Sequence, residues 1–550
     1  MRRVATGLFL FLFTILPSSF AQIPAFPGAE GFGSATPGGR GGRVIYVTTL
    51  NPSGPGSISE AVGSSGPRIV VFKVGGTIEF NPPATLTISN PFITIAGQTA
   101  PGGGITLKSC NLVLGTHDII LRGIRSRLGD APGGILGGRR DPIRVGSESD
   151  GEVYNVIIDH CSMSWSVDEG TEVIGGSTHH VTVQYCYVGE SLDCSIHVKG
   201  CHSKGLSAHN TGGGNVSFHH NIIAHSRDRN PQMLASSNIE CVNNVVYNYE
   251  FGGRYGNGAQ VNFVGNRYIP GPDTPPNRYG LVHLIDDATS TTRVYVRGNI
   301  GNGRPTNTGN EWLIARDAAT FRSMAPLFTE NVSAEDVDEM WPSILDRAGC
   351  MPHDPVDERI KSDILNGTGG WIDSQNELGG WPALDPGPAP LDSDNDGMPN
   401  SWETAAGLNP SDPSDGSGDL DGNGYTNVED YINGIIMQGG GGTTTGGSPG
   451  TIPQQTGLWQ NFPNPFNPTT TIGYTLEEGG HVNLTVYNLL GQPVVELVDA
   501  MQNAGYREVV WAGRNGKDEP VTSSVYFYRI EFTGESGSVY VNQKRMILVK

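Results

Sequence analysis

Two short acidic segments near residue 400 have the residue types and spacing of calcium-binding loops. Between Asp385 and Asp430 the sequence has eleven Asp or Glu residues and no Lys or Arg. The first segment fits the EF-hand spacing, in which oxygen ligands at positions 1, 3, 5, 7 and 12 surround Ca²⁺ and a glycine at position 6 makes the turn. The predicted ligands are the side chains of Asp392, Asp394, Asp396 and Glu403 and the backbone carbonyl of Met398.

The second acidic segment keeps the same offsets but has Asp instead of Glu at the twelfth position. Its predicted ligands are Asp419, Asp421, Asn423, Tyr425 and Asp430. A solvated acidic linker is the alternative interpretation of both segments. We expect residues 385–437 to form a small EF-hand-like, dockerin-like module whose Ca²⁺ ions stiffen the chain between two larger domains.

Histidines are a second group of side chains that could do chemistry. Nine of the thirteen lie between His160 and His225, which raises the hypothesis of a zinc site. The sequence has no HExxH or CxxC spacing, however, and several of these histidines follow the period of an internal repeat: His160, His180, His219 and His220. Structural histidines at turns are therefore the favoured interpretation.

An internal repeat of short strands must position these side chains. Alternating apolar residues recur at intervals of 22 to 37 residues, in strands that begin at Ile93, Ile119, Val156, Val181, Val216, Ile239, Val261 and Val294. Four units have an asparagine at the same offset, which is typical of stacked side-chain amides: Asn221, Asn244, Asn266 and Asn299. A unit this short cannot bury its own core, so copies must stack. The pattern predicts a parallel β-helix with functional insertions at 124–161, 186–221 and 266–299.

Composition limits the class of protein further. The chain has 550 residues, 37% of them hydrophobic, with 78 Gly and 37 Pro, which suits many short strands joined by turns and excludes a helical bundle for most of the length. A net charge of −20 excludes nucleic-acid binding through a broad basic surface. Seven cysteines are too few for a disulfide scaffold, and we interpret most of them as buried apolar residues.

The two ends of the chain predict export. Residues 1–21 have the charged, apolar and small-residue layout of a secretory signal peptide, and no later apolar run approaches the length that spans a bilayer. A short helix is expected at Val356–Leu365, a Gly/Thr-rich linker at 438–456 and a β-sandwich at 457–550. The mature protein should be secreted, either extracellular or attached to the cell surface, and monomeric.

Several blocks of the sequence resemble those of a known family. They are AFPGAEGFG (25–33), RIVVFKVGGTIEF (68–80), ITIAGQTAPGGGI (93–105), NVIIDHCSMSWSVDEG (155–170) and HHNIIAHSRDRNPQ (219–232). In this order they resemble the secreted pectate lyases of polysaccharide lyase family 1. The resemblance implies an all-β fold with a right-handed parallel β-helix over residues 22–384. It also implies Ca²⁺-dependent β-elimination of polygalacturonate, or pectin, to unsaturated oligogalacturonates.

The resemblance also implies the site residues. By position in family-like blocks, Asp141, Asp168 and Glu169 would hold the catalytic-site Ca²⁺. Arg229 falls where the family has its catalytic arginine, and Lys199 is the second catalytic candidate. Because a guanidinium normally stays protonated, Arg229 could act as the base or by stabilising charge.

The C-terminal block resembles the sorting domains of type IX secretion cargo. It begins with NFPNPFNP (461–468) and ends with KRMILVK (544–550). The resemblance implies an interaction with secretion machinery and passage across an outer membrane. An accessory, carbohydrate-binding β-sandwich is the alternative.

Two other functions are compatible with a β-helix scaffold. A glycoside hydrolase would use a carboxylate pair without calcium. A non-catalytic polysaccharide-binding surface protein would tolerate the loss of Arg229. The fold alone does not separate these functions from a lyase.

Overall fold

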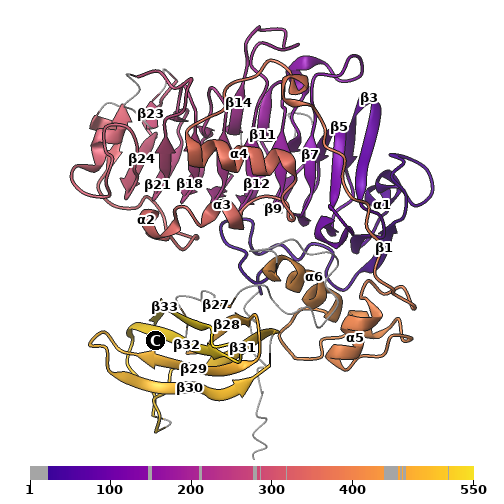
Figure 1. Cartoon of the computed structure of the whole chain (residues 1–550). Coiled ribbons are helices and arrows are strands. Elements are labelled where there is room, and N and C mark those ends of the chain that lie inside the picture. The colour runs from indigo at the N-terminus through magenta and orange to yellow at the C-terminus, as the bar shows by residue number, and fades with distance from the viewer. Residues whose placement is uncertain are drawn as a thin grey trace, which may run out of the picture.

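The computed structural model describes residues 23–549, except 147–150, 210–213, 277–281, 285–286, 317–318, 439–455, 459–460, 462–465, 467, 504 and 518. The predicted signal peptide lies outside the described residues, and so does nearly all of the predicted linker. Figure 1 shows a long stack of strands, helices packed along it, and a separate β-sandwich. Among the described residues, no helix has the length and apolar character needed to cross a membrane.

The stack is a parallel β-helix, as predicted. One sheet runs through eleven parallel strands, β1 (Arg43–Val47), β2 (Arg68–Phe72), β4 (Ile93–Ala96), β6 (Ile119–Arg122), β9 (Val153–Asp159), β12 (Thr178–Gln184), β15 (Val216–His219), β18 (Asn238–Val242), β21 (Gln260–Val264), β24 (Arg293–Arg297) and β26 (Arg322–Ser323). Each of the eight predicted repeat strands is one of these, so the sequence repeat is the rung of the helix.

A second parallel sheet supplies the other two faces of the β-helix, which meet at the long strand β5 (Ile105–Leu114). From β5 one face continues through β7 (Arg125–Arg127), β10 (Ser162–Ser164), β13 (Tyr187–Gly189), β16 (Ile222–Ala224), β19 (Val245–Tyr247) and β22 (Arg267–Ile269). The other continues through β8 (Ile143–Val145), β11 (Glu169–Ile174), β14 (Lys204–His209), β17 (Gln232–Leu234), β20 (Gly253–Tyr255), β23 (Val282–Leu284) and β25 (Ala315–Arg316), and β3 (Gly76–Ile88) also pairs with β5.

Two interior features hold the rungs in register. The inward apolar residues stack directly, so that Val156, Val181 and Val216 are consecutive Cα partners in one buried core. At the turn, the amide nitrogen of Asn221 donates to the side-chain oxygen of Asn244 at 3.0 Å, and Asn244 and Asn266 continue the ladder at 2.9 Å. The predicted amide ladder is confirmed, and it satisfies polar groups that would otherwise be buried without partners.

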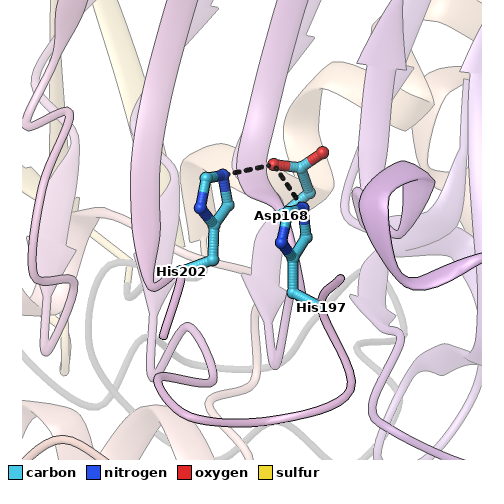
Figure 2. A group of neighbouring side chains, drawn as sticks. All are labelled: Asp168, His197 and His202. Carbon is cyan, nitrogen blue, oxygen red and sulfur yellow. Dashed lines mark ion pairs between the residues drawn. The ribbon is translucent and has the colours of Figure 1, made fainter. Parts of the chain in front are cut away.

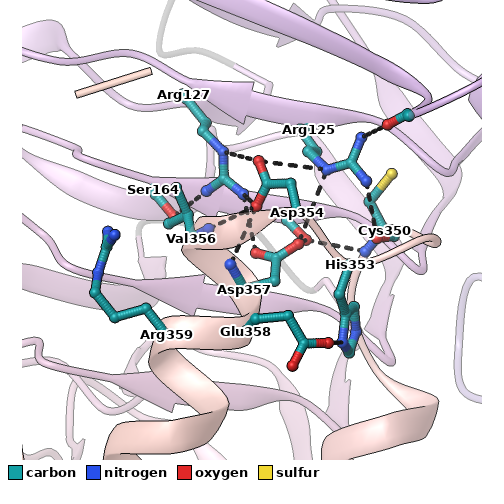
Figure 3. Close-up of polar contacts among 12 residues, drawn as sticks. Arg125, Arg127, Ser164, Cys350, His353, Asp354, Val356, Asp357, Glu358 and Arg359 are labelled. Atoms are coloured by element: carbon teal, nitrogen blue, oxygen red, sulfur yellow. Dashed lines mark hydrogen bonds and ion pairs between the residues drawn. The ribbon is translucent and has the colours of Figure 1, made fainter. Parts of the chain in front are cut away.

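Helix α4 (Pro355–Asn366) covers the outer face of the second sheet, close to the predicted Val356–Leu365 helix. Its apolar side packs on outward residues of the rungs, including Tyr187 and Tyr247. Its N-cap residue Asp354 and, in its first turn, Asp357 pair with two arginines of β7. Arg127 lies 2.6 Å from Asp354 and 3.0 Å from Asp357 (Figure 3), and all these side chains are buried.

Two smaller units, the acidic segment and the C-terminal sandwich, follow the β-helix and the helices on it, which also include α1 (Ile58–Gly63). Helices α2 (Val337–Met340) and α3 (Ile344–Arg347) precede α4, and the acidic segment contains α5 (Asn400–Ala406) and α6 (Asn427–Gln438). Two antiparallel sheets with their own core form the C-terminal β-sandwich: β27 (Gly457–Leu458), β28 (Thr470–Leu476) and β31 (Gly505–Trp511) against β29 (Gly480–Tyr487), β30 (Pro493–Gln502), β32 (Ser524–Gly534) and β33 (Val539–Leu548). The sandwich confirms the predicted fold of this end of the chain.

The α4 ion pairs predict a stability effect. Burial alone would raise the pKa of Asp354, but the charges of Arg127 and Arg125 outweigh burial and lower it. Asp354→Asn keeps a side chain that can cap α4 but leaves two buried arginines poorly compensated. We expect it to lower the free energy of unfolding by about 3–5 kcal/mol at neutral pH, measured by urea unfolding.

The same measurement at lower pH tests the electrostatic cause. A carboxyl whose folded pKa is depressed stabilises the fold above its unfolded pKa of about 3.9, and this contribution disappears as the pH falls through the folded value. The stability difference between the native chain and Asp354→Asn should therefore begin to shrink below about pH 4 and disappear only once the pH is below the folded pKa of Asp354. Glu358→Gln, on the exposed side of α4, is the control and should change little. A constant difference at every pH would contradict the electrostatic explanation.

Candidate active site

The candidate site forms where four neighbouring parallel strands begin. Asp141 precedes β8, Glu169 begins β11, Lys204 begins β14 and Arg229 precedes β17. Glu169 and Lys204 are direct Cα partners, and Lys204 forms a further parallel bridge with Asp228. Because adjacent strands are only about 4.8 Å apart, four positions distant in sequence become one row of charged side chains.

Three carboxylates at this edge lie close enough to share a cation. One ligand oxygen from each of Asp141, Glu169 and Glu172 lies within 4.8 Å of the others, and all three residues are buried. The backbone N–H of Glu169 donates to Asp141 at 2.9 Å. Glu172 was not among the predicted ligands, and in a regular strand residues 169 and 172 would lie on opposite faces. The contact depends on the local backbone at the start of β11.

The electrostatics of this cluster suit a divalent cation. Burial raises the pKa of Asp141 well above its ordinary value, and the neighbouring carboxylates of Glu172 and Asp168 raise it further. Arg144 offsets part of this effect and lies 2.8 Å from Glu172. Buried carboxylates that repel one another offer the oxygen donors that Ca²⁺ prefers, so the residues fit the expected ion.

Arg229 lies against the carboxylate cluster. Its guanidinium contacts Glu169, and 21% of the Arg229 side chain is exposed, so a ligand can reach it. Burial lowers the pKa of Arg229, the cation of Arg254 lowers it further, and the carboxylates of Asp168 and Asp141 oppose both effects. The backbone of Arg229 is left-handed, with φ of 62°, and its N–H donates to Asp228 at 2.8 Å.

Lys204, which the sequence interpretation did not choose, completes the row. Its ammonium group lies 3.0 Å from Asp228, which also pairs with Arg254 at 2.6 Å. Lys199 instead lies in an exposed part of the loop between β13 and β14. Its role stays a prediction. A signal for Lys204 was present in the sequence, since it begins a short alternating run, Lys204-Gly205-Leu206-Ser207-Ala208, that adds the next strand beside Glu169.

Asp168, the third predicted ligand, is held by two histidines. Figure 2 shows the imidazoles of His197 and His202 side by side, with one nitrogen of each directed at Asp168. The Nε2 atoms lie 3.7 Å and 3.0 Å from the same Asp168 oxygen, and the rings stack at 3.9 Å. Burial alone would raise the pKa of Asp168, but His202 and His197 lower it. Asp168 therefore remains a carboxylate, with 16% of its side chain exposed.

A disulfide closes the loop that presents these histidines. Cys194 and Cys201 are bonded, and the other five cysteines are free and buried, as the composition predicted for most of them. Inside the loop the N–H of Lys199 donates to Nδ1 of His197 at 3.0 Å. A neutral imidazole that accepts at Nδ1 carries its proton at Nε2. The Nε2 atom of His197 lies 3.7 Å from Asp168, beyond hydrogen-bond distance, and Asp168, His197 and His202 form one of the groups of side chains that could hold a metal ion.

The other predicted site residues lie elsewhere on the molecule. The two acidic loops pack beside β1, β2 and β4 through Met398 and α6. Asp159 and His160 form the structural pair expected of a rung turn, at 2.8 Å, and Arg122 also pairs with Asp159 at 2.8 Å. His160, His180 and His220 have left-handed backbones in or next to the rung strands.

Comparison with known proteins gives a consistent set of relatives. No protein-family model matches the chain. A protein named "Probable pectate lyase C" from Aspergillus flavus is 34% identical over 431 residues, which is 76% of this chain and 95% of the relative. The protein of the same name from Aspergillus terreus is 34% identical over 444 residues, 78% of this chain and 98% of the relative. A crystal structure of a pectate lyase from Bacillus sp. N165 in complex with trigalacturonate matches with 20% identity and a TM-score of 0.42, over 58% of this chain and 98% of that chain.

The loop geometry predicts a fixed imidazole tautomer. Nitrogen-15 spectra of histidine-labelled protein at neutral pH should show the proton of His197 on Nε2, because Nδ1 accepts the Lys199 N–H. One equivalent of Zn²⁺ should leave this signal unchanged. The exposed His481, which pairs with Asp499, serves as the reference ring. A His197 signal with Nε2 deprotonated or displaced by Zn²⁺ would instead identify a metal ligand.

Proposed function

This chain belongs to the pectate lyase family and is a polysaccharide lyase, and we propose that it cleaves polygalacturonate by calcium-dependent β-elimination to unsaturated oligogalacturonates. One observation carries the proposal: an arginine with a lowered pKa contacts a buried cluster of carboxylates that fits Ca²⁺. The relatives are named pectate lyases, which favours a lyase over a glycoside hydrolase or a non-catalytic binding protein. The trigalacturonate named with the Bacillus structure is of the same substrate class.

The reaction requires removal of a proton next to a carboxylate group. β-Elimination takes the C5 proton of a uronate, forms the C4–C5 double bond and breaks the C4–O glycosidic bond, and the departing oxygen takes up a proton. We assign proton removal to Arg229, whose neutral guanidine would accept the C5 proton at a terminal nitrogen. The lowered pKa of Arg229 makes this form more accessible, and alkaline solution favours it further.

The carboxylates of the site would hold the cation. Asp141, Asp168 and Glu169 are the predicted ligands, and the position of Glu172 adds it to the set. When bound, Ca²⁺ supplies positive charge that stabilises the enolate-like charge developing at the substrate carboxylate. Asp168 depends on His197 and His202 for its ionised state and position. Lys204 faces the same edge and would bind the uronate carboxylate or the developing charge.

The cellular location is a separate part of the proposal. The signal-peptide-like residues 1–21 and a C-terminal β-sandwich with its own core support export, with the sandwich acting on secretion machinery. A secreted enzyme would meet an acidic plant-type polysaccharide outside the cell. The monomeric state remains a prediction.

The catalytic assignments predict different effects for three neighbouring cations. Arg229→Ala should lower the rate of polygalacturonate cleavage by about 10²–10⁴-fold, which is the usual contribution of a positioned acid or base. Lys204→Ala should cause a large loss as well, whereas Lys199→Ala, in the exposed loop, should stay close to the native rate. The measurement is the ultraviolet absorbance of the conjugated C4–C5 double bond, with Ca²⁺ and then with a chelator.

The outcomes separate the alternatives. Absorbance that requires Ca²⁺ and is lost in Arg229→Ala supports the proposed reaction. New reducing ends without absorbance would indicate hydrolysis, and native activity in a chelator would refute the role of calcium. A large loss of activity in Lys199→Ala with native activity in Lys204→Ala would instead support Lys199, the lysine predicted from the sequence, as the catalytic lysine.

A further inference from the structure

The first acidic loop contains buried carboxylate oxygens without partners. Glu403 is fully buried, and neither of its oxygens has a hydrogen-bond partner. Both oxygens of Asp394 and one oxygen of Asp396 are likewise buried and unpartnered. Leaving a buried charged oxygen unpaired is strongly unfavourable, so a cluster of them indicates an ion that the folded chain requires.

A residue outside the predicted loop belongs to this cluster. Asp415, at the start of the short 3₁₀ helix η6 (Asp415–Ser417), has a ligand oxygen within 4.8 Å of those of Asp396 and Glu403. One Asp415 oxygen accepts from the N–H of Asn409 at 2.9 Å, and the other is buried and unpartnered. Asp396 has the same arrangement, with one oxygen 2.9 Å from the N–H of Met398 and the other free.

The charges of the cluster oppose one another. Burial and, after it, the carboxylates of Asp394, Asp396 and Asp415 together raise the pKa of Glu403 to about 7. Burial and the carboxylates of Asp394, Asp392 and Asp415 likewise raise the pKa of Asp396 to about 7, although the N–H of Met398 opposes them. A divalent cation among these oxygens would remove the repulsion and restore the ionised forms.

The second acidic loop differs because its side chains satisfy one another. Asp419 accepts from the N–H groups of Gly422, Asn423 and Gly424 at 2.8–3.1 Å. The amide of Asn423 donates to both Asp421 and Asp430 at 3.0 Å. Among the described residues, the grouped metal-ligating side chains include the first loop and none of the second. Asp430 is also shorter than the glutamate that an EF-hand loop uses as a bidentate ligand.

The first loop is attached to the N-terminal rungs of the β-helix. Met398 packs in one apolar cluster with Ile69 and Val71, the outward residues of β2, and with α6 residues Val428 and Ile432. The hydroxyl of Tyr46 on β1 donates to Asp392. Lys73 donates to Asn395 at 2.7 Å and lies over the ring of Tyr46 at 3.9 Å. Any ion that rigidifies this loop therefore also fixes its contacts with β1 and β2.

We propose that Asp392, Asp394, Asp396, Glu403 and the external ligand Asp415, with the carbonyl of Met398, form a structural Ca²⁺ site that fastens residues 385–437 to the first rungs. The second loop holds no equivalent ion at the same affinity. This site is independent of the candidate active site and of the lyase reaction. Its role is to stabilise the N-terminal end of the β-helix.

The test counts calcium and measures stability in the full mature chain. All variants are made in an Asp141→Asn background, so that the candidate active site does not contribute an ion. We expect one tightly bound Ca²⁺ per chain by metal analysis after gel filtration, and a melting temperature that falls when a chelator is added. Glu403→Gln should lose the ion and the chelator effect. Asp415→Asn should weaken Ca²⁺ binding by roughly 10-fold or more, and Asp421→Asn, in the second loop, is the matched control without effect.

Stability in the chelator separates loss of the ion from misfolding. Glu403→Gln removes an unpaired buried charge, so without calcium it should be at least as stable as its parent. An unchanged ion count in Glu403→Gln, native affinity in Asp415→Asn, or equal losses in Asp421→Asn would each overturn the proposal. Polygalacturonate cleavage by the chain without the Asp141 substitution is measured separately, so failure of either assay leaves the other interpretable.

Discussion

The register of the parallel strands is the constraint on which the rest of this structure depends. A single rung buries too little apolar surface to be stable, so each rung relies on the next one for its core and its backbone hydrogen bonds. The stacked valines of the interior and the amide ladder through Asn221, Asn244 and Asn266 both fail if one rung slips by a residue. A slip would also turn every inward side chain outward. The buried polar ladder therefore specifies the register that the apolar core alone leaves less sharply defined.

That register also creates the candidate active site. Asp141, Glu169, Lys204 and Arg229 are separated by 28, 35 and 25 residues in sequence, yet they begin consecutive strands of one face. Their charges are arranged so that each cation has an acidic neighbour: Arg229 contacts Glu169, and Lys204 pairs with Asp228. The row is rigid because its members begin strands, whereas the Cys194–Cys201 loop adds His197 from outside the sheet. A site on strand ends with a loop at its side can hold fixed charges and still leave room for a polymer.

Buried charge is managed in three different ways across the molecule. Under α4, aspartates and arginines neutralise one another within the protein. In the candidate active site, Arg144 and Arg229 compensate the carboxylates only in part, which leaves these carboxylates able to bind a cation. In the first acidic loop the oxygens of Glu403 have no protein partner at all. The degree of compensation thus separates a structural ion pair from the candidate active site and from the proposed calcium site.

The sequence alone determined the fold and the chemistry of its parts. The rung period, the asparagine ladder, the α4 helix and the C-terminal sandwich follow from local patterns that a strand or helix must repeat, and family-like blocks predicted Arg229, Asp141 and Glu169 as site residues. Tertiary structure alone decided which charged residues meet. Glu172 lies close to Asp141 and Glu169, although strand alternation would put residues 169 and 172 on opposite faces. Lys204, rather than Lys199, is the Cα partner of Glu169. Asp415 lies close to the carboxylates of the first acidic loop, although the EF-hand spacing does not include it. These contacts join different rungs or loops, and their distances depend on insertions and turns whose geometry no short sequence pattern encodes.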